Sequence, residues 1–310
     1  MVRGAVVRKK AHKEEESVGS HIFTIFLYVF FMVFTFICVY PFYYLIINSI
    51  SANDMSGLGQ IILIPHKIHF DNYRQVLTLP GLAQSALISV GRSTLGPICT
   101  LCASAFLGFM FTQEKLWLRA LWYRFVIATM YFNAGLIPWY ITMVNLRLNN
   151  NFLAYILLAV VSPFCIILVK TYIESLPKEL QEAAEIDGAG IFRVFSQVIF
   201  PLCTPILATV VIFAAVWQWN SFQDTLVLMT NQKLYPLQFM LYQYINQAVT
   251  LAQTLKNGQS SSMVVSAAST QTALSVRMTV SVIVVLPILI VYPFFQRYFV
   301  KGIMIGAVKG

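Results

Sequence analysis

Aromatic, amide and hydroxyl side chains follow one another in residues 217–224, near the end of a long apolar run. Aromatic faces beside amide and hydroxyl groups can bind a sugar by stacking and hydrogen bonding. On a continuous helix, Asn220 and Gln223 would lie one turn apart on one face, and Trp219 would adjoin that face. Polar side chains in a membrane-length run usually face a cavity or another helix. We therefore expect this stretch to line part of a substrate cavity.

Other interpretations of the same stretch remain open. The tryptophans could form an aromatic belt at the membrane surface, with Trp217 better placed than Trp219 for packing or lipid contact. Gln218 and Asn220 could instead bond to neighbouring helices. Arg92 and Asp224 also lie within apolar runs, so an ion pair across the bundle is a further alternative for these two charges.

A second polar segment, residues 171–201, separates two apolar runs and is rich in carboxylates. Carboxylates are costly at the bilayer centre, so this segment must lie outside the membrane. It reads as two short helices around Gly188, a residue suited to a left-handed helix C-cap. At helical spacing one face collects Leu176, Leu180, Ala183, Ala184 and Asp187. A face of such small residues is shaped to dock into a groove on another protein.

A helix lying on the lipid surface, or an ordinary solvated loop, would also be polar. Helices that lie on lipid are usually rich in Lys and Arg on their polar face. This segment instead has only Lys178 and Arg193 against a larger number of Glu and Asp residues between Glu174 and Asp187. The charge balance therefore favours docking of a protein.

No catalytic constellation is visible, and we predict a chain that is not an enzyme and needs no cofactor. His66 and His69 have no further Cys or His ligand beside them, so no metal site is expected. The five cysteines lie in or at the ends of apolar runs, where they are expected to pack. The sequence lacks a Gly-x-x-x-x-Gly-Lys-Ser/Thr loop, so any ATP that drives this protein must bind to a partner.

The composition is that of an integral membrane protein. Of the 310 residues, 58% are hydrophobic and only 11% are charged, whereas soluble domains carry about 25% charged residues. No charged residue lies between Ser17 and Asn53, which is longer than a cleavable signal peptide requires and predicts a first membrane helix. The net charge is +9, and groups of Lys and Arg flank the first and last apolar runs, which is typical of topology signals and not of a nucleic-acid patch.

The apolar runs predict an all-α fold with six transmembrane helices in a single domain, residues 22–310, after a basic leader at 1–21. The expected spans are 22–50, 82–111, 121–144, 148–169, 202–229 and 276–299. Lys and Arg are about twice as frequent on the side that holds both termini and residues 171–201, which places that side in the cytoplasm. The outer loops, 51–80 and 231–274, are long enough to be functional, although simple flexibility is the alternative.

The polar segment 171–201 resembles the EAA loop of ABC importer permeases. Glu182, Ala183, Ala184 and Gly188 match its Glu-Ala-Ala, three residues, Gly pattern. Val198 and Phe200 replace an isoleucine and a leucine of the Ile-x-Leu-Pro ending, and both replacements are apolar.

Three further stretches extend the resemblance to about residues 70–310. Residues 133–138 are similar to a Gly-Gly-Leu-Ile-Pro stretch of sugar-importer permeases, with Ala134 in place of the first glycine. Residues 69–73 are similar to their Thr-x-x-Asn-Tyr element, and residues 293–310 to their Gln-Arg/Lys-Tyr-Phe-Val-x-Gly and Gly-Ala-Val-Lys-Gly tail. The chain thus resembles carbohydrate-class permeases of the MalG type, near the branch that handles oligosaccharides or polysaccharide fragments.

This resemblance implies the type I ABC importer permease fold in a bacterial inner membrane. It implies a heterodimer with a second permease, two ATP-binding subunits at the cytoplasmic loop, and an extracytoplasmic binding protein that delivers a carbohydrate. The coupling residues would be Glu182, Ala183, Ala184, Asp187 and Gly188. The cavity residues would be Asn133, Trp219, Asn220 and Gln223. The alternatives are an ABC permease for a solute other than a sugar, and an ATPase-independent channel or secondary transporter.

Overall fold

The computed structural model describes residues 18–256 and 273–307, and this part of the chain contains helices and turns but no strand. The long helices are α1 (Val18–Ser49), α4 (Leu82–Met110), α12 (Thr204–Asn220), α14 (Leu237–Lys256) and α16 (Ala273–Ala307). In lipid a helix satisfies its own backbone hydrogen bonds, which is why these apolar runs fold as helices.

Short helices connect and flank the long ones. Before α12 they are α2 (Asn53–Gly57), α3 (Asp71–Leu77), α5 (Arg119–Tyr131), α6 (Leu136–Asn145), α7 (Leu153–Leu157), α8 (Pro163–Glu174), α9 (Glu179–Ile186), α10 (Ile191–Arg193), the π-helix η1 (Val194–Ile199) and α11 (Phe200–Leu202). After α12 they are α13 (Gln223–Leu228) and the 3-10 helix η2 (Gln232–Leu234).

Three helical stretches in the described part are long and apolar enough to cross a membrane: His21–Ser49, Leu82–Met110 and Ser275–Phe294. Two bent pairs raise the number to as many as five. Arg119–Tyr131 meets Leu136–Asn145 at 118°, and Ile191–Leu202 meets Thr204–Asn220 at 80°. The three stretches agree with the first, second and sixth expected spans, whereas the count of six is not confirmed.

The other three expected spans are wrong as continuous helices. The run 121–144 breaks at Gly135, whose φ of 85° is left-handed and whose N–H donates to the Asn133 side chain at 2.9 Å. The run 148–169 is divided because Ser162 caps a new helix that starts at Pro163. The run 202–229 ends its helix at Asn220, since Ser221 is extended.

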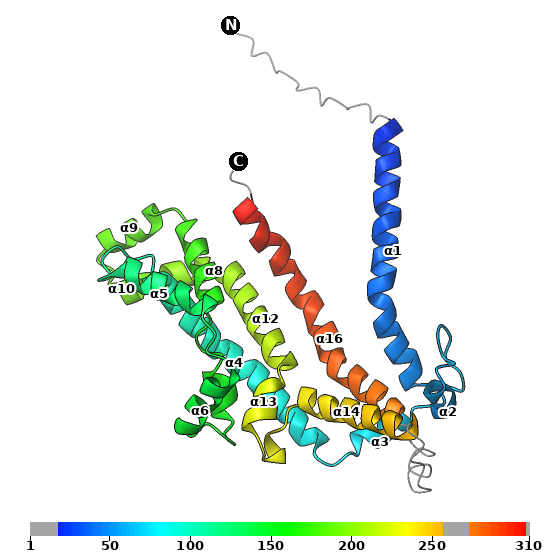
Figure 1. The fold of residues 1–310 in the computed structure, drawn as a ribbon. Coiled ribbons are helices and arrows are strands. Elements are labelled where there is room, and N and C mark those ends of the chain that lie inside the picture. The colour runs from blue at the N-terminus through cyan, green and yellow to red at the C-terminus, as the bar shows by residue number, and fades with distance from the viewer. Residues whose placement is uncertain (1–17, 257–272, 308–310) are drawn as a thin grey trace.

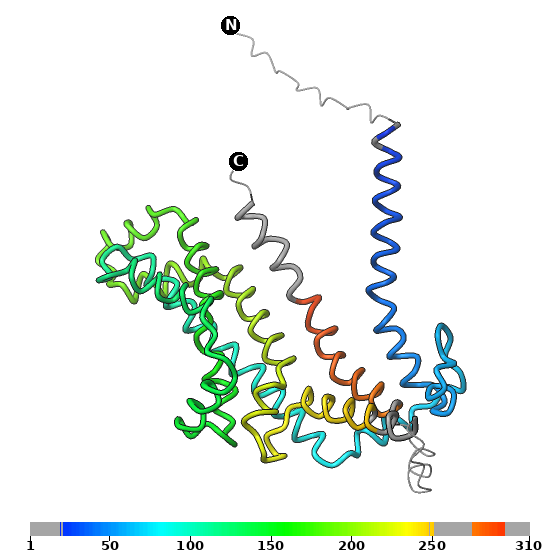
Figure 2. The backbone as a smooth tube through the Cα atoms, in the orientation of Figure 1, coloured from blue at the N-terminus to red at the C-terminus, as the bar shows by residue number. Residues whose placement is uncertain are grey.

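α4 lies at the centre of the packed helices, between α12 and α8, while α16 lies against α12 on the other side (Figure 1). The core between α4 and α8 forms by close approach at Gly108, where an added Cβ would lie 2.9 Å from Val169 Cγ1. α1 meets α16 near one end and otherwise lies apart from the bundle (Figure 2). Its large side chains, such as Tyr28 and Met32, are about 70% exposed, as expected of a helix that faces lipid.

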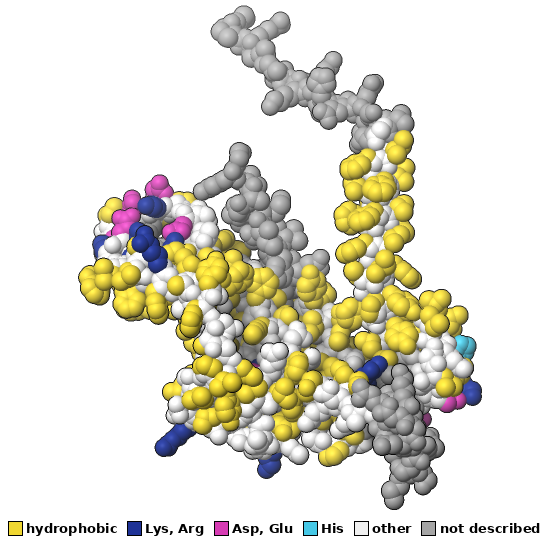
Figure 3. Space-filling view, in the orientation of Figure 1, with side chains coloured by type: hydrophobic (Ala, Val, Ile, Leu, Met, Phe, Trp, Pro, Cys, Tyr) yellow, Lys and Arg dark blue, Asp and Glu magenta, His cyan; other side chains and the backbone are white. Residues whose placement is uncertain are grey.

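The expected outer loops contain helices. Residues 51–80 hold α2 and α3, and residues 231–274 hold η2 and α14, with 257–272 outside the described residues. Of the expected basic leader, residues 1–17 also lie outside the described part, and α1 begins at Val18. Apolar side chains cover α1 and much of the visible body, whereas charged side chains gather near α9 (Figure 3). That distribution separates a membrane-compatible body from a polar end.

Candidate functional site

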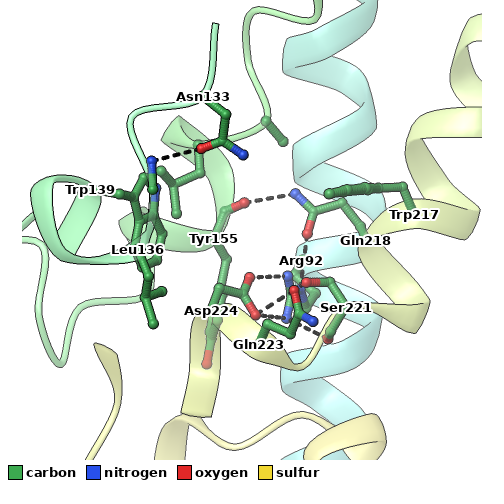
Figure 4. Close-up of a pocket in the computed structure, with 13 residues that line it drawn as sticks. Arg92, Asn133, Leu136, Trp139, Tyr155, Trp217, Gln218, Ser221, Gln223 and Asp224 are labelled. Carbon is green, nitrogen blue, oxygen red and sulfur yellow. Dashed lines mark hydrogen bonds and ion pairs between the residues drawn. The ribbon is translucent and has the colours of Figure 1, made fainter. Parts of the chain in front are cut away.

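A pocket of about 540 Å³ opens where α4, α6, α7, α12 and α13 meet (Figure 4). Its polar and aromatic lining residues are Arg92, Asn133, Trp139, Tyr155, Trp217, Gln218, Ser221, Gln223 and Asp224. The loop 158–159 and residues 135–136 complete the wall with small and apolar groups. The pocket therefore combines indole faces with amide and hydroxyl groups.

Arg92 of α4 is the most deeply placed charge of the pocket, with 1% of its surface exposed. Its Nη2 forms an ion pair with Asp224 Oδ2 at 2.5 Å, and its Nε donates to Gln218 Oε1 at 2.9 Å. Its Nη1 donates to the Ser221 carbonyl at 3.1 Å, and the guanidinium lies 4.2 Å from the centre of the Tyr155 ring. Arg92 and Asp224 therefore form the ion pair that the sequence left as one alternative. A buried arginine needs such a partner for its charge.

Gln218 is held from two sides. Its Oε1 accepts from Arg92, and its Nε2 donates to the Tyr155 carbonyl at 2.7 Å. The side chain fits because Gly96 of α4 has no Cβ, which would lie only 2.6 Å from Gln218 Nε2. The interpretation of Gln218 as an interhelical hydrogen-bonding residue is confirmed.

The break between α12 and α13 rearranges the predicted cavity residues. Asp224 Oδ1 accepts from the Thr225 N–H at 2.9 Å and from Ser221 Oγ at 3.2 Å, which stabilises the start of a new helix. Asn220 ends α12 and Gln223 begins α13, so the expectation that these two share one helical face is wrong. Sequence periodicity cannot detect a break that a distant arginine helps to hold.

The structure brings only some of the predicted cavity residues together. Gln223 and Asn133 line the pocket, whereas Asn220 is exposed and outside its lining. Trp219 turns toward α16, where its Nε1 donates to the Val284 carbonyl at 3.0 Å. Trp217, expected against protein or lipid, lines the pocket instead.

Sequence reasoning missed two lining residues, Trp139 and Tyr155, whereas Ser221 lies in the stretch 217–224 that was expected to line a cavity. Trp139 directly follows the residues 133–138 singled out for their resemblance, and that position was the available signal. Tyr155 lies in the run 148–169, where Pro163 marks a break but nothing indicates that the Tyr155 hydroxyl bonds to Thr225 at 2.9 Å. Its role depends on contacts that only the folded chain reveals.

The pocket is suited to binding a polar molecule. Asp224 compensates the charge of Arg92, so the groups presented to the open space are amides, a hydroxyl and two indoles. Within the described residues no group of three or more His, Cys, Asp and Glu is placed to hold a metal ion. Stacking and hydrogen bonding are the chemistry that the lining offers.

The polar segment forms a second candidate site at α9, near the polar end of the molecule (Figure 3). Gly188 ends it with a φ of 80°, as predicted for a left-handed cap. Ala184 is half-buried and packs against the core between α4 and α8, whereas Glu182, Ala183 and Asp187 are exposed. The predicted docking face is therefore divided, with Ala184 turned inward.

Large apolar side chains add to the exposed part of α9. Ile186 is 85% exposed and Leu180 is 42% exposed. Exposed apolar side chains beside carboxylates outside a membrane are typical of a protein-docking surface.

Side chains of the turn that follows α4 contact α9. Gln181 Nε2 donates to Gln113 Oε1 at 2.9 Å, and Lys115 Nζ lies 3.0 Å from Glu185 Oε2. The hydrogen bond from Gln181, and then the charge and hydrogen bond of Lys115, lower the pKa of Glu185 below its usual 4.5. The ion pair between Lys115 and Glu185 is therefore fully present at neutral pH, and it is lost only as the pH falls through the lowered pKa of Glu185.

Comparison with known proteins places these features in a family. Residues 101–305 match the family described as binding-protein-dependent transport system inner membrane component. The match includes both α9 and most of the pocket.

Individual relatives align over nearly the whole chain. The polygalacturonan/rhamnogalacturonan transport system permease protein YtcP of Bacillus subtilis is 29% identical, over 94% of this chain and 99% of its own. Protein LplC of the same organism is 30% identical, over 88% and 90%. A crystal structure of a bacterial ABC transporter involved in import of the acidic polysaccharide alginate contains a similar chain, with a TM-score of 0.78, 28% identity and coverage of 91% and 98%.

Proposed function

We propose that this chain, which belongs to the family of binding-protein-dependent transport system inner membrane components, is the permease subunit of an ATP-driven carbohydrate importer. The single observation that carries the proposal is the pocket in which Trp139, Trp217 and Gln223 surround a neutralised Arg92–Asp224 pair. One relative whose name specifies polygalacturonan/rhamnogalacturonan transport, and a similar chain in an alginate importer, support an oligosaccharide or polysaccharide fragment as the substrate.

The pocket would contribute one wall of the transport path. Sugar rings stack on indoles through their C–H faces while their hydroxyls bond to amides. Trp217 and Trp139 would supply stacking, and Gln223 and Asn133 would supply hydrogen bonds. Asn220 is exposed on the last turn of α12, so it would meet substrate only if the path extends beyond the pocket.

The exposed face of α9 would receive an ATP-binding subunit. Glu182, Ala183, Asp187 and Gly188 would form the contact, with Ala184 fixing the helix to the body. α4 joins the two sites directly, because it carries Arg92 in the pocket and runs to Met110, just before Gln113 beneath α9. Its rise of about 1.5 Å per residue puts the two sites roughly 27 Å apart.

This arrangement suits alternating access. Closure of the ATP-binding subunits would displace α9, and α4 would transmit the movement to the pocket wall. The chain itself would perform no hydrolysis.

In the membrane, six spans would form a single domain at residues 22–310, with breaks inside the third, fourth and fifth. The N-terminal end of α1 and the C-terminal end of α16 point toward the end of the molecule that carries α9 (Figure 1). With α9 at an ATP-binding subunit, both termini would be cytoplasmic and α2, α3 and α14 would face outward. A second permease and an extracytoplasmic binding protein would complete the importer.

The alternative, an ATPase-independent channel or secondary transporter, leaves the exposed Ile186 and Ala183 of α9 without a role. Purification of the tagged chain from its native membrane separates the two functions. We expect an ATP-binding subunit and a second permease to co-purify, and ATP-dependent uptake of a labelled oligosaccharide by the reconstituted complex. Glu182→Lys with Ala183→Asp should remove the ATP-binding subunit while the second permease stays bound.

Asp54→Lys is the matched control, because Asp54 is an exposed carboxylate on α2, at the other end of the molecule. It should retain both partners. Uptake that continues without ATP, or a chain that purifies without either partner, would contradict the proposed function.

A further inference from the structure

The loop between α2 and α3 carries an apolar tip that nothing in the transport function uses. Ile62, Leu63 and Ile64 are 57%, 58% and 68% exposed, whereas the preceding Ile61 is fully buried. No charged residue lies between Asp54 and Lys67, so the charges flank the loop while its tip is purely apolar. In Figure 1 the segment after α2 turns back beside α1.

Side chains of α1 bind the tip through its backbone. Tyr40 OH donates to the Ile62 carbonyl at 3.1 Å, and Tyr43 OH donates to the Leu63 carbonyl at 2.6 Å. Asn48 Nδ2 reaches the Ile61 carbonyl at 3.3 Å. Three successive carbonyls of an irregular loop thus each accept from a side chain of the same helix. That arrangement is what a non-helical backbone needs where water is scarce.

The position of the tip along α1 can be estimated from the base of the loop. The Ala52 N–H donates to the His66 carbonyl at 3.1 Å, which closes the base beyond the end of α1. Tyr43 and Tyr40 precede Ala52 in the chain, and a rise of about 1.5 Å per residue sets them roughly 14–18 Å back along the helix axis. The tip therefore lies beside the membrane-length stretch His21–Ser49 and well below its outer end.

From these contacts we infer that residues 61–64 insert into the outer leaflet of the membrane and contact phospholipid acyl chains. The exposed tip is continuous with the apolar surface of α1, where Phe36 and Val39 are also more than half exposed. The Tyr40 and Tyr43 hydroxyls each donate to a carbonyl of the tip, so neither phenol oxygen is left unpaired beside the acyl chains. The inserted loop braces α1, a helix that otherwise lies apart from the bundle (Figure 2).

This inference rests on the membrane placement of α1 and requires neither a sugar nor an ATPase. A nitroxide at Leu63→Cys in the complete importer, reconstituted in phosphatidylcholine liposomes, tests it. Cys38, Cys99 and Cys102 are first changed to alanine, while the buried Cys165 and Cys203 stay. Asp54→Cys, at an exposed charge of α2, is the matched control.

At position 63 we expect dissolved oxygen to relax the nitroxide more strongly than a water-soluble nickel complex, and at position 54 we expect the reverse. Stronger relaxation by nickel at position 63 would place the tip in water and overturn the inference. Weak relaxation by both reagents at position 63 would mean that a protein covers the tip, which also overturns it.

The tyrosine contacts have their own test. Tyr40→Phe with Tyr43→Phe removes both donors but keeps the rings, and should lower the ratio of oxygen to nickel relaxation at position 63 at least twofold. Tyr28→Phe, on the same helix and 71% exposed, should leave the ratio unchanged. An equal ratio in both variants would show that α1 does not hold the loop in lipid. Sugar uptake need not change in any of these variants, so the inference and the proposed function fail separately.

Discussion

Arg92 and Asp224 form a buried ion pair although 132 residues separate them in the chain. The pair joins the middle of α4 to the first turn of α13, and Arg92 Nη1 also donates to the Ser221 carbonyl at the break that follows α12. Both side chains are largely hidden, with 2% and 14% of their surfaces exposed. The pair therefore fixes the place where the helix ends and the pocket opens.

Removal of either charge of the Arg92–Asp224 pair should destabilise the folded chain. Arg92→Met leaves Asp224 as an uncompensated buried charge, and Asp224→Leu does the same to Arg92. Each should destabilise the chain by about 3–5 kcal/mol. The double variant, Arg92→Met with Asp224→Leu, leaves neither charge and should regain much of the loss. Thermal stability of the detergent-solubilised chain, followed by gel filtration after heating, gives the ranking.

The exposed pair of Lys115 and Glu185 is the matched control. Its side chains are 84% and 40% exposed, and exposed pairs contribute little. Lys115→Met should leave thermal stability nearly unchanged. A double variant as unstable as Arg92→Met alone would contradict the charge argument and point to lost packing.

Long apolar runs made the helices α1, α4 and α16 predictable from sequence. The hydrophobic periodicity and the composition of these stretches sufficed, because each helix satisfies its own backbone hydrogen bonds and carries few charges. Gly188 was equally predictable, since its left-handed φ of 80° follows from its place after a short helix. The residues proposed for docking on α9 are close together in the sequence, which is why spacing alone could single them out, and their docking role stays a prediction.

The pocket was less predictable because distant contacts build it. Asn220 and Gln223 were placed on one face by helical spacing, but that spacing ends at Ser221, whose carbonyl is held by Arg92. Trp217 and Trp219 exchanged their expected roles, because Trp219 bonds to Val284 on a helix more than sixty residues away. Proline and glycine marked the breaks in the third and fourth spans, but their presence alone did not distinguish a kink from a division.

Gly108 should tolerate no larger residue. A Cβ there would lie 2.9 Å from Val169 Cγ1 and 3.2 Å from the backbone N of Lys170, so α4 and α8 would have to separate. We expect Gly108→Ala to destabilise the chain by about 1–3 kcal/mol. Gly190→Ala is the control, because nothing lies within 4 Å of the added atom. The same heating assay compares them, and equal stability of the two variants would show that the helices move apart freely.

Gly188 should control the coupling of α9 through its backbone. Its φ of 80° costs alanine about 1–2 kcal/mol, whereas asparagine visits this region more readily. Proline cannot adopt it and would also lose the N–H that donates to the Glu185 carbonyl at 3.0 Å. Substrate-stimulated ATP hydrolysis of the assembled complex should fall in the order Gly, Asn, Ala, Pro. Full activity of Gly188→Pro would show that the shape of this cap is unimportant.

Gln223 and Asn220 should now differ, although their sequence spacing made them equivalent. Gln223 lines the pocket, while Asn220 is exposed outside its lining. Loss of one hydrogen bond to a sugar hydroxyl corresponds to about 0.5–1.5 kcal/mol, so Gln223→Ala should slow uptake about 2–13-fold. Asn220→Ala should transport at the normal rate. Neither change should alter membrane abundance or the affinity of the isolated binding protein for its ligand. If Asn220→Ala is the slower variant, the substrate path runs outside this pocket and the assignment of Gln223 is wrong.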